Sequence, residues 1–348
     1  MEPLTQLGAV VLAAGRSTRF RSRGSKLVHP LAGRPLIQWS LSALREIGAQ
    51  PLVVVVGYEA DAVMAASGAG VAFAHQQEQR GTGHAVLATE PLLGGFAGDL
   101  LIVNPDVPLL RAETLRHLVG VHRAANATLT LATATLADAG GWGRIVRREG
   151  VVHAVVEDRD ADHEVRAIRE VNVGLYCVKP DFLFAALRRL APNNAQGEIY
   201  LTDVVAAAAA ARARIADVEV DAAEVGQINS RRELVQMEHT MQVAARTRWM
   251  EAGVTLEDPD TVYIEPDVTI GRDTIIGPNV HLRGRTVIGE GCRLDGTDYL
   301  TDAVCGDNVH IRFGVVIAGA TVAPGVEVGP LVELRPGTAA SKRARKQR

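Results

Sequence analysis

The sequence predicts an α/β domain with a mainly parallel sheet, followed by a linking helix and a parallel β-helix. In the first part, apolar strand-like runs alternate with segments of helical periodicity. In the last part, an apolar residue recurs at every sixth position, which neither a helix nor an ordinary strand produces. We therefore expect a domain over residues 1–229, a linking helix over 230–252 and a β-helix over 253–338.

The alternation in the first part gives the expected strands and helices. The strand-like runs are residues 10–14, 52–56, 99–103 and 127–136. A helical pattern begins at Pro35, which suits the first helical position, and ends at Gly48. Residues 83–93 form a second helical pattern. Strands joined by helical crossovers pair in parallel, so ligand-binding loops are expected at the carboxyl ends of the strands.

One face of residues 231–250 repeats apolar side chains at helical spacing. The apolar residues of that face are Leu234, Met237, Met241, Ala244 and Ala245. This segment is interpreted as a single helix that links the two folded parts.

After Gly253 the apolar residues recur with a period of six. The residues in phase are Ile264, Ile270, Ile276, Leu282, Ile288 and Leu294, and glycine directly follows three of them. In a parallel β-helix each short strand points one such residue inward, and the stacked coils bury a continuous column. The phase slips after Leu300, so we expect an extra loop over residues 298–306. The pattern resumes at Val316, Val322, Val328 and Leu334.

The composition argues against several classes of protein. The 348 residues carry a formal net charge of −3, which argues against a general nucleic-acid binder. Cys177, Cys292 and Cys305 lack metal-ligand spacing, and their odd number does not suggest a disulfide framework. No apolar run approaches the roughly twenty residues of a membrane span, and there is no signal peptide pattern. We expect a cytoplasmic protein without nucleic-acid or membrane partners, whose basic end, 339–348, is a disordered tail.

A loop with small residues directly follows the first strand. The sequence LAAGRSTRF at residues 12–20 leads to Lys26. Small residues let a backbone approach a ligand closely, so that N–H groups can face phosphate oxygens. Arg19 and Lys26 could then meet the phosphate charge. The alternative is that they are two surface cations in an ordinary loop.

Several further motifs follow in order along the chain. They are Gln76 with GTGHA at 81–85, DVPL at 106–109, GWGRI at 141–145, VE at 156–157, EVNVG at 170–174 and NNAQGEIYLTD at 193–203. With these motifs the chain resembles the bifunctional N-acetylglucosamine-1-phosphate uridylyltransferase/glucosamine-1-phosphate acetyltransferase family. The resemblance implies a Rossmann-like nucleotidyltransferase domain followed by a left-handed β-helix. It also implies Mg²⁺-dependent formation of UDP-N-acetylglucosamine, a cell-wall precursor, and pyrophosphate from UTP and a sugar-1-phosphate.

The resemblance implies a centre made of phosphate-binding cations and a metal ion. Arg19 and Lys26 would hold the triphosphate as catalytic residues, and Asp106 and Asn229 would bind Mg²⁺. Mg²⁺ prefers oxygen ligands and keeps several waters, so one carboxylate and one amide are a plausible protein share. No general base is needed, because the attacking phosphate oxygen is already ionised. Capping roles for Asp106 and Asn229 are the alternative.

The remaining site residues implied by the resemblance bind the substrates. They are Leu12, Ala14 and Gly15 for the nucleotide, Gln76, Gly81 and Thr82 for uracil, and Gly143, Glu157, Asn172 and Thr202 for the sugar. A turn with a helix cap is the alternative at 81–83, and a solvated charge is the alternative for Glu157. His84 is interpreted as a structural residue at a helix start.

The chain departs from the family pattern at a few site positions. Ser17 stands where glycine is usual, and Ser25 replaces a proline, which we expect to loosen the segment before Lys26. Asn104 and Pro105 precede Asp106 in place of an aromatic residue and glycine, and Val173 replaces a threonine. These departures leave open another sugar-1-phosphate, such as glucose-1-phosphate, or another base.

The expected role of the β-helix differs from that of the family. Residues 334–337 look like the start of an acetyltransferase site, and Arg335 alone cannot transfer an acetyl group, so we expect no such activity. A short solenoid exposes its last coil, which favours a homo-oligomer, most simply a trimer. A non-catalytic sugar-nucleotide sensor or assembly subunit is the alternative of a different class.

Overall fold

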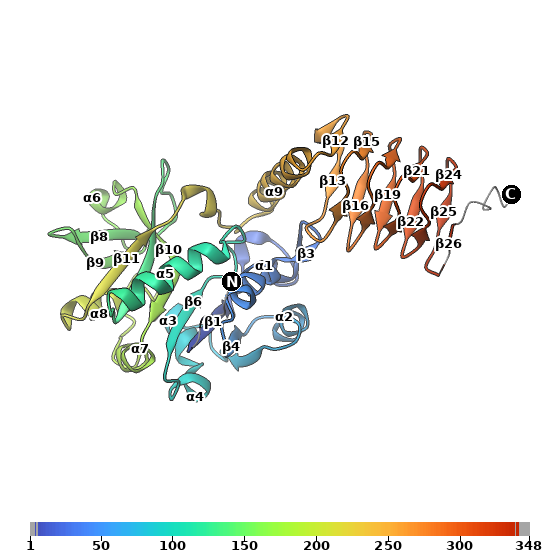
Figure 1. The fold of residues 1–348 in the computed structure, drawn as a ribbon. Coiled ribbons are helices and arrows are strands. Elements are labelled where there is room, and N and C mark those ends of the chain that lie inside the picture. The colour runs from blue at the N-terminus through green and yellow to red at the C-terminus, as the bar shows by residue number, and fades with distance from the viewer. Residues whose placement is uncertain (1–3, 5, 338, 341–348) are drawn as a thin grey trace. The chain divides into compact units, whose positions relative to one another are not determined.

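The structure is a computed structural model that describes residue 4, residues 6–337 and residues 339–340 (Figure 1). The chain forms two compact units. The first contains the chain up to His29 together with Arg34–Glu233, and the second contains Pro30–Gly33 together with the chain from Leu234.

The first unit is an α/β domain around a mixed sheet. The order of its principal strands is β11 (Ile215–Glu219), β7 (Leu129–Thr135), β10 (Glu170–Val178), β6 (Asp99–Val103), β1 (Leu7–Ala13), β4 (Leu52–Val56) and β5 (Ala72–His75). Among these strands only β10 runs antiparallel to its neighbours. The mainly parallel sheet expected from the sequence is therefore confirmed. A hairpin of β8 (Arg144–Arg148) and β9 (Val151–Val156) joins the sheet through β10.

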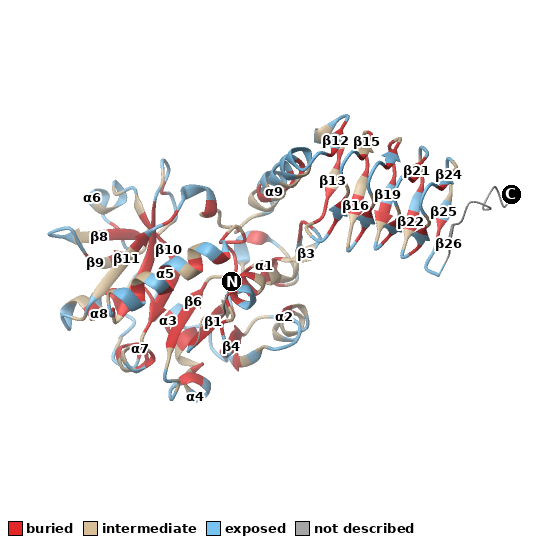
Figure 2. Ribbon diagram, viewed as in Figure 1, coloured by how far each residue is buried: buried red, intermediate tan, exposed pale blue. Residues whose placement is uncertain are grey.

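Helices cover the sheet in two layers. One layer contains α1 (Leu36–Glu46), α2 (Ala60–Ser67) and α5 (Ala112–Ala124), and the other contains α3 (Thr82–Leu87), α7 (Pro180–Leu187) and α8 (Asp203–Ala210). Two shorter helices are α4 (Glu90–Leu93) and α6 (His163–Arg166). Strands β4 and β6 are buried along their whole length between the layers, as their red colour in Figure 2 shows. Such strands are expected where helices cover both faces of a parallel sheet.

The single helix predicted over residues 83–93 is wrong, because the structure has two helices there. Helix α3 ends at Leu87, and α4 starts at Glu90. Pro91 lies in the first turn of α4; a proline lacks the backbone N–H and clashes with the carbonyl four residues earlier. It therefore suits a helix start and prevents one continuous helix.

Helix α9 (Arg231–Glu251) is the single long helix expected from the sequence, and the boundary between the units falls in its first turn. Of the predicted apolar face only Met237 is buried, and the polar side chains of Gln242 and Arg246 are buried with it. The Gln242 amide accepts a hydrogen bond from the backbone N–H of Ile264 (2.9 Å) and donates one to its carbonyl (3.1 Å). Polar side chains are buried here because they satisfy the backbone of the first coil.

The second unit is a parallel β-helix with three sheets (Figure 1). The first sheet contains β12 (Thr255–Leu256), β15 (Ile275–Ile276), β18 (Arg293–Leu294), β21 (His310–Ile311) and β24 (Glu327–Val328). The second contains β13 (Tyr263–Ile264), β16 (His281–Arg283), β19 (Tyr299–Thr301), β22 (Val316–Ala318) and β25 (Glu333–Leu334). The third contains β14 (Thr269–Ile270), β17 (Val287–Ile288), β20 (Val304–Cys305), β23 (Thr321–Val322) and β26 (Ala339–Ala340).

The extra loop predicted over residues 298–306 is wrong, because the structure has a shortened turn instead. Tyr263 pairs with His281, eighteen residues later, whereas Val287 pairs with Val304, only seventeen later. One residue fewer separates β19 from β20, and one fewer separates β22 from β23, so the sixfold phase shifts by one residue at each of these two turns. Val316 is consequently exposed, and its neighbour Ile317 is fully buried.

Glycines in the β-helix allow neighbouring coils to stack closely. A Cβ on Gly271 would lie 2.5 Å from the backbone nitrogen of Glu290 in the next coil. Gly329 follows its core residue in the same way, but a Cβ there would meet no atom of the described chain within 4 Å. The glycines therefore matter where another coil lies against them.

Gly271→Ala is expected to lower the free energy of unfolding of the second unit by about 2–3 kcal/mol, because backbone atoms must move apart. Gly329→Ala, the matched control, is expected to change it by less than about 0.5 kcal/mol. Urea unfolding followed by circular dichroism measures both. Equal effects of the two substitutions would contradict this explanation.

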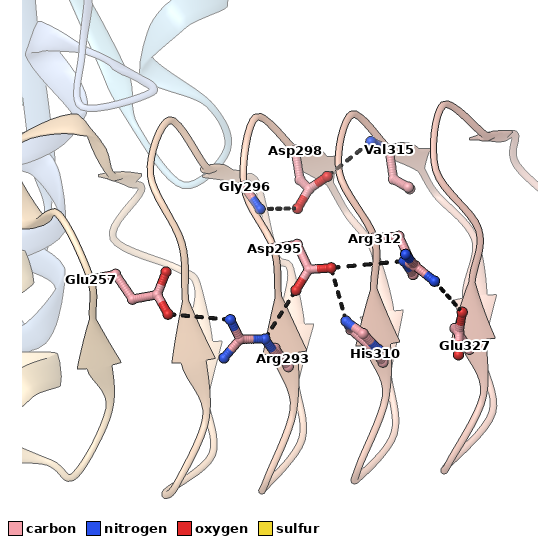
Figure 3. A network of polar contacts seen from close by, with 9 residues as sticks. All are labelled: Glu257, Arg293, Asp295, Gly296, Asp298, His310, Arg312, Val315 and Glu327. Carbon is pink, nitrogen blue, oxygen red and sulfur yellow. Dashed lines mark hydrogen bonds and ion pairs between the residues drawn. The ribbon is translucent and has the colours of Figure 1, made fainter.

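Figure 3 shows a network of charged side chains along the first sheet of the β-helix. Asp295 accepts from Arg293 (3.0 Å) and His310 (3.0 Å), and Arg312 continues the row to Glu327 (3.1 Å). Asp298 lies apart from this row and is almost fully buried. It accepts hydrogen bonds from the backbone N–H groups of Val315 (2.9 Å) and Gly296 (3.2 Å).

The stability of the β-helix is expected to depend on the protonation of Asp298. Burial raises the pKa of this carboxyl from 3.8 to about 6, although the backbone N–H groups oppose the shift. The folded state therefore binds a proton more strongly than the unfolded state, and the associated stability is present below about pH 4 and lost as the pH rises through 6. Asp298→Asn should remove this dependence of stability on pH. Urea unfolding of both chains between about pH 4 and 7.5 should show the unaltered chain losing stability relative to the variant; a constant difference would contradict the assignment.

The predicted basic tail lies mostly outside the described residues. Residues 341–348 are not described, whereas Ala339–Ala340, assigned to the tail from the sequence, form β26 and pair with β23. Among the described residues, no helix is long and apolar enough to cross a membrane.

A short segment near the N-terminus belongs to the second unit. The N–H of Ala32 donates to the Glu238 carboxylate (2.6 Å). Gly33 has a φ of 80°, and a Cβ at this position would overlap the carboxylate of Glu265. Glycine is required here by the backbone angle and by this close approach.

Candidate functional site

Three oxygen atoms converge on the ammonium group of Lys26. The Nζ atom lies 2.8 Å from Asp106 Oδ2, 2.9 Å from Asn229 Oδ1 and 2.7 Å from the carbonyl oxygen of Ile228. Lys26 and Asp106 are both buried, with 7% and 8% of their surface exposed. The structure thus brings together the proposed phosphate-binding lysine and both proposed metal ligands, although the sequence separates them by up to 203 positions.

The strand–loop connections of the sheet explain this convergence. Lys26 begins a short 3-10 helix, Lys26–Val28, shortly after β1, and Asp106 follows the neighbouring strand β6. The carboxyl ends of adjacent parallel strands meet at the same edge of the sheet. The N–H of Ile228 also donates to the backbone carbonyl of Asp106 (3.0 Å), which fixes the segment before α9 beside the same edge.

Serine at two loop positions has consequences that the sequence predicted only in part. Ser17 adopts a φ of 50°, in the left-handed region where glycine is usual. A non-glycine residue there costs roughly 1 kcal/mol. The expected loosening by Ser25 is not found, because this residue is fully buried and its hydroxyl accepts from the N–H of Leu27 (3.3 Å).

A helix cap that was not predicted from the sequence holds Asn229. The Glu233 carboxylate accepts from the N–H groups of Asn229 (2.6 Å) and Ser230 (2.8 Å), and the Ser230 hydroxyl accepts from the N–H of Glu233 (3.2 Å). This reciprocal pair is a capping box. Its sequence signal, serine followed three residues later by glutamate, is present at 230–233.

The oxygen atoms around Lys26 fit a hard divalent cation. Asp106 Oδ1 is buried without a hydrogen-bond partner among the described residues, and Gln227, also missed from the sequence, donates to Oδ2 (3.2 Å). No group of three or more His, Cys, Asp or Glu side chains suited to a metal ion occurs in the described chain. The donors are thus a carboxylate, an amide and a carbonyl, and this set leaves room for phosphate and water, as Mg²⁺ requires.

Arg19 lies in a pocket beside these residues. It is not one of the groups that contact Lys26. The pocket has a volume of about 450 Å³. It is lined by Arg19, Phe20, Arg21, Ser230, Arg231, Arg232 and Glu233. Since Ser230 directly follows Asn229, the pocket opens next to the proposed metal ligands.

Gln76 fixes the loop that precedes α3. Its amide nitrogen donates to the carbonyl of Gly81 (3.0 Å) and to Nδ1 of His84 (3.1 Å). The two N–H bonds of the amide are thereby used, and its oxygen is left as an acceptor. His84 acts as a structural partner of Gln76 in this arrangement.

Gly81 and Thr82 are locked against a later segment of the chain. Gly81 has a φ of 106°, and a Cβ there would overlap the carbonyl oxygen of Ile199. The Thr82 hydroxyl accepts from the N–H of Leu201 (2.9 Å). This loop is therefore rigid on the side of the proposed uracil site.

The segment that leaves β1 is open to a ligand at one position. Leu12 is half-buried at the end of β1, and Ala14 is buried. The carbonyl of Ala14 accepts from the Gln79 side chain (2.8 Å). Gly15 is exposed, and a Cβ there would meet nothing within 4 Å in the described chain. Space beside Gly15 allows close approach of a nucleotide.

The four proposed sugar-binding residues form two pairs. Thr202 donates to the Glu157 carboxylate (3.0 Å), and the N–H of Asn172 donates to the carbonyl of Gly143 (2.9 Å). Burial raises the pKa of Glu157, while the Thr202 hydroxyl opposes that shift. A half-buried carboxylate with one donor is a good acceptor for a sugar hydroxyl or amide.

An irregularity in β10 lies next to Asn172, whose Oδ1 accepts from the N–H of Gly174 (3.2 Å). The pairing of β10 with β7 shifts between Asn172 and Tyr176, where Gly174 has a φ of 79°. The Asn104 side chain lies so close to Gly174 that a Cβ would overlap it. Bulges commonly occur next to active sites and re-aim side chains. Asn104, a departure from the family pattern, thus contacts the strand that carries Asn172.

Comparison with known proteins gives consistent results. Residues 9–192 match the MobA-like NTP transferase domain, and residues 260–296 match the bacterial transferase hexapeptide (six repeats). The chain is 45% identical to the "Bifunctional protein GlmU" of Trichlorobacter lovleyi over 95% of its own length and 73% of the relative. It is 47% identical to the "Bifunctional protein GlmU" of an Anaeromyxobacter species over 96% of its own length and 69% of the relative.

A solved structure shares the fold. A UDP-glucose pyrophosphorylase complexed with UDP-glucose superposes with a TM-score of 0.55 at 20% identity, covering 68% of this chain and 98% of that one. At this identity the match supports the α/β architecture alone. The similarity to the two GlmU proteins, by contrast, spans nearly the whole chain and therefore both units. The chain therefore belongs to the GlmU family of nucleotidyltransferases.

Proposed function

We propose that this protein transfers the uridylyl group of UTP to N-acetylglucosamine-1-phosphate in a Mg²⁺-dependent reaction. The observation that carries the proposal is the convergence of Asp106 and Asn229 on the ammonium group of Lys26, at 2.8 Å and 2.9 Å, at one edge of the sheet. A cation and a carboxylate held together beside a phosphate-binding loop suit phosphoryl-type transfer.

The residues act mainly by positioning and by neutralising charge. Asp106, Asn229 and the carbonyl of Ile228 would hold Mg²⁺, which neutralises phosphate charge when it is bound. Lys26 contacts the same oxygens in this structure, and with Mg²⁺ bound its ammonium group would face the phosphates instead. Arg19 approaches the triphosphate from its pocket. The attacking phosphate oxygen is already ionised, so the chain needs to orient it rather than deprotonate it.

Base selection is proposed to rest on Gln76. Its amide nitrogen is bonded to Gly81 and His84, so the oxygen remains to accept the N3–H of uracil. Cytosine lacks a proton at that nitrogen and would be rejected. Gly15 lets the backbone approach the nucleotide.

Sugar selection is proposed to rest on Glu157, Thr202 and Asn172. The Glu157 carboxylate can accept a hydrogen bond from a sugar hydroxyl or from the N–H of the N-acetyl group. Asn104 and Pro105 favour a second candidate, transfer to another sugar-1-phosphate such as glucose-1-phosphate, because Asn104 contacts Gly174 beside Asn172. The β-helix is proposed to mediate a homotrimer.

A substrate panel tests the proposal. UTP, dTTP and CTP are each combined with N-acetylglucosamine-1-phosphate or glucose-1-phosphate, and pyrophosphate release is measured with and without Mg²⁺. We expect UTP and N-acetylglucosamine-1-phosphate to give the highest kcat/KM. Asp106→Ala is expected to lower it by about 10³-fold. Asp181→Ala, which alters an exposed aspartate in α7, is the matched control.

Two results would contradict the proposal. Equal turnover of glucose-1-phosphate would replace the sugar by the second candidate. Equal activity of Asp106→Ala and the unaltered chain would remove the metal assignment.

A further inference from the structure

The pocket beside Asn229 is lined by several arginines, and the function proposed above uses only one of them, Arg19. Arg19, Arg21, Arg231 and Arg232 all line its volume of about 450 Å³. They come from two segments far apart in the sequence, the loop after β1 and the first turn of α9. We call this set of residues the arginine pocket.

The charge of this pocket is not neutralised within the described chain. No described carboxylate lies within ion-pair distance of any of the four guanidinium groups, and all four residues are exposed. Glu233 is the acidic residue of the lining. Its carboxylate already accepts the N–H groups of Asn229 and Ser230. The capping box therefore occupies the helix start and leaves the guanidinium groups as the anion-binding groups.

Two neighbouring residues, Phe20 and His29, interact with the guanidinium group of Arg231. The guanidinium of Arg231 lies 4.6 Å from the centroid of the Phe20 ring, so the aromatic face holds it at the pocket wall. The pKa of His29 is lowered, first by burial and then by the charge of Arg231. An unneutralised cation held in place is suited to bind phosphate.

We propose that the arginine pocket binds the β- and γ-phosphates of the nucleotide and then the pyrophosphate leaving group. This inference rests on the proposed function. In the transfer a sugar-phosphate oxygen bonds to the α-phosphorus, and the bond from that phosphorus to the bridging oxygen breaks. The bridging oxygen keeps the electron pair and leaves as part of pyrophosphate. Arg231 and Arg232 stabilise that charge as it develops.

The location of the pocket agrees with this role. Asn229 belongs to the proposed metal site, and Ser230, the next residue, lines the pocket. A triphosphate with its α-phosphate near Lys26 would then place its terminal phosphates beside the arginines. Arg21, Arg231 and Arg232 are added in this way to Arg19 as ligands of the leaving group.

Binding of pyrophosphate itself tests the proposal without catalysis. Calorimetric titration of the full chain with pyrophosphate is compared for Arg231→Gln, Arg232→Gln and the double variant. The matched control is Arg189→Gln, an exposed arginine beyond α7 with the same change of charge. We expect each pocket variant to weaken binding about tenfold, with a larger loss in the double variant, and the control to bind as the unaltered chain does.

Kinetics of the reverse reaction give a second measurement. The pocket variants should raise KM for pyrophosphate and leave KM for the nucleotide sugar unchanged, which a folding defect would not do. Unchanged pyrophosphate affinity in the double variant would overturn the proposal, and so would equally tight binding of sulfate, which would indicate a general anion site.

Failure of the proposed function would look different. Pyrophosphate binding that depends on Arg231 and Arg232, without turnover of any sugar-1-phosphate, would leave the pocket assigned and the transferase assignment wrong. Turnover with binding that is independent of both arginines would leave the transferase assigned and the pocket wrong.

Discussion

Lys26→Met is expected to abolish nucleotidyl transfer and to lower the free energy of unfolding of the metal-free protein by about 3 kcal/mol. The ammonium group contacts Asp106, Asn229 and the carbonyl of Ile228, and its removal leaves a buried carboxylate without a cation. Methionine keeps most of the length of the side chain. Urea unfolding in the presence of a chelator measures the loss.

The same variant is expected to bind Mn²⁺ without nucleotide more tightly than the unaltered chain does. Lys26 and a divalent ion compete for the same oxygens, so removing the lysine frees them. Electron paramagnetic resonance of free Mn²⁺ measures this affinity. Lys179→Met is the matched control, because Lys179 also pairs with a buried aspartate, Asp99, but is about half-exposed. Unchanged Mn²⁺ affinity in Lys26→Met would show that the lysine does not occupy the metal position.

Gly81→Ala is expected to lower kcat/KM for UTP by about 10²-fold, because the proposed base-binding loop must move. A Cβ would overlap the carbonyl of Ile199, and the φ of 106° is strained for any side chain. Displacement of the loop would break the hydrogen bond between Gln76 and Gly81. Steady-state kinetics with UTP as the varied substrate measure the effect.

Gly95→Ala provides the control for that substitution. Gly95 lies in the same unit and is exposed, and a methyl group at this position would meet no described atom within 4 Å. It should leave kcat/KM unchanged. Full activity of Gly81→Ala would show that the loop does not contact the base.

The sequence predicts the strands of the first unit well where burial is complete. The runs at 52–56 and 99–103 coincide with β4 and β6, because helices cover both faces and nearly every position is apolar. The helix predicted over 83–93 was wrong since the apolar pattern continues through Pro91, although the backbone cannot. The proline ends the continuous helix there, and apolar periodicity does not detect such a break.

The β-helix shows a second limit of periodicity. Three adjacent residues, Val315, Val316 and Ile317, are all apolar and β-branched, so the pattern alone cannot choose which of them points inward. One residue is missing from the turn before β20 and another from the turn before β23, so the buried position in β22 is Ile317. A deletion and an insertion both shift the phase, and only the pairing of the strands distinguishes them.

Around the candidate site, motifs indicated the residues but not their contacts. Lys26, Asp106 and Asn229 were named from the sequence, yet their common point depends on pairing between β1 and β6 and on the segment before α9. The capping box at 230–233 has a local sequence signal, but the apolar periodicity that predicts α9 carries no trace of it. The cluster of arginines in the pocket joins two segments from opposite ends of the first unit, which no local pattern reveals.

The membership of Pro30–Gly33 in the second unit means that the two units are interleaved in the sequence. A chain cut before Leu234 would keep this segment but lose Glu238 and Glu265, the groups that hold Ala32 and Gly33. The segment Pro30–Gly33, which would lose these partners, starts only four residues after Lys26. An N-terminal fragment that ends before Leu234 would therefore not reproduce this part of the protein. A circular permutation would have to keep all three points at which the chain passes from one unit to the other.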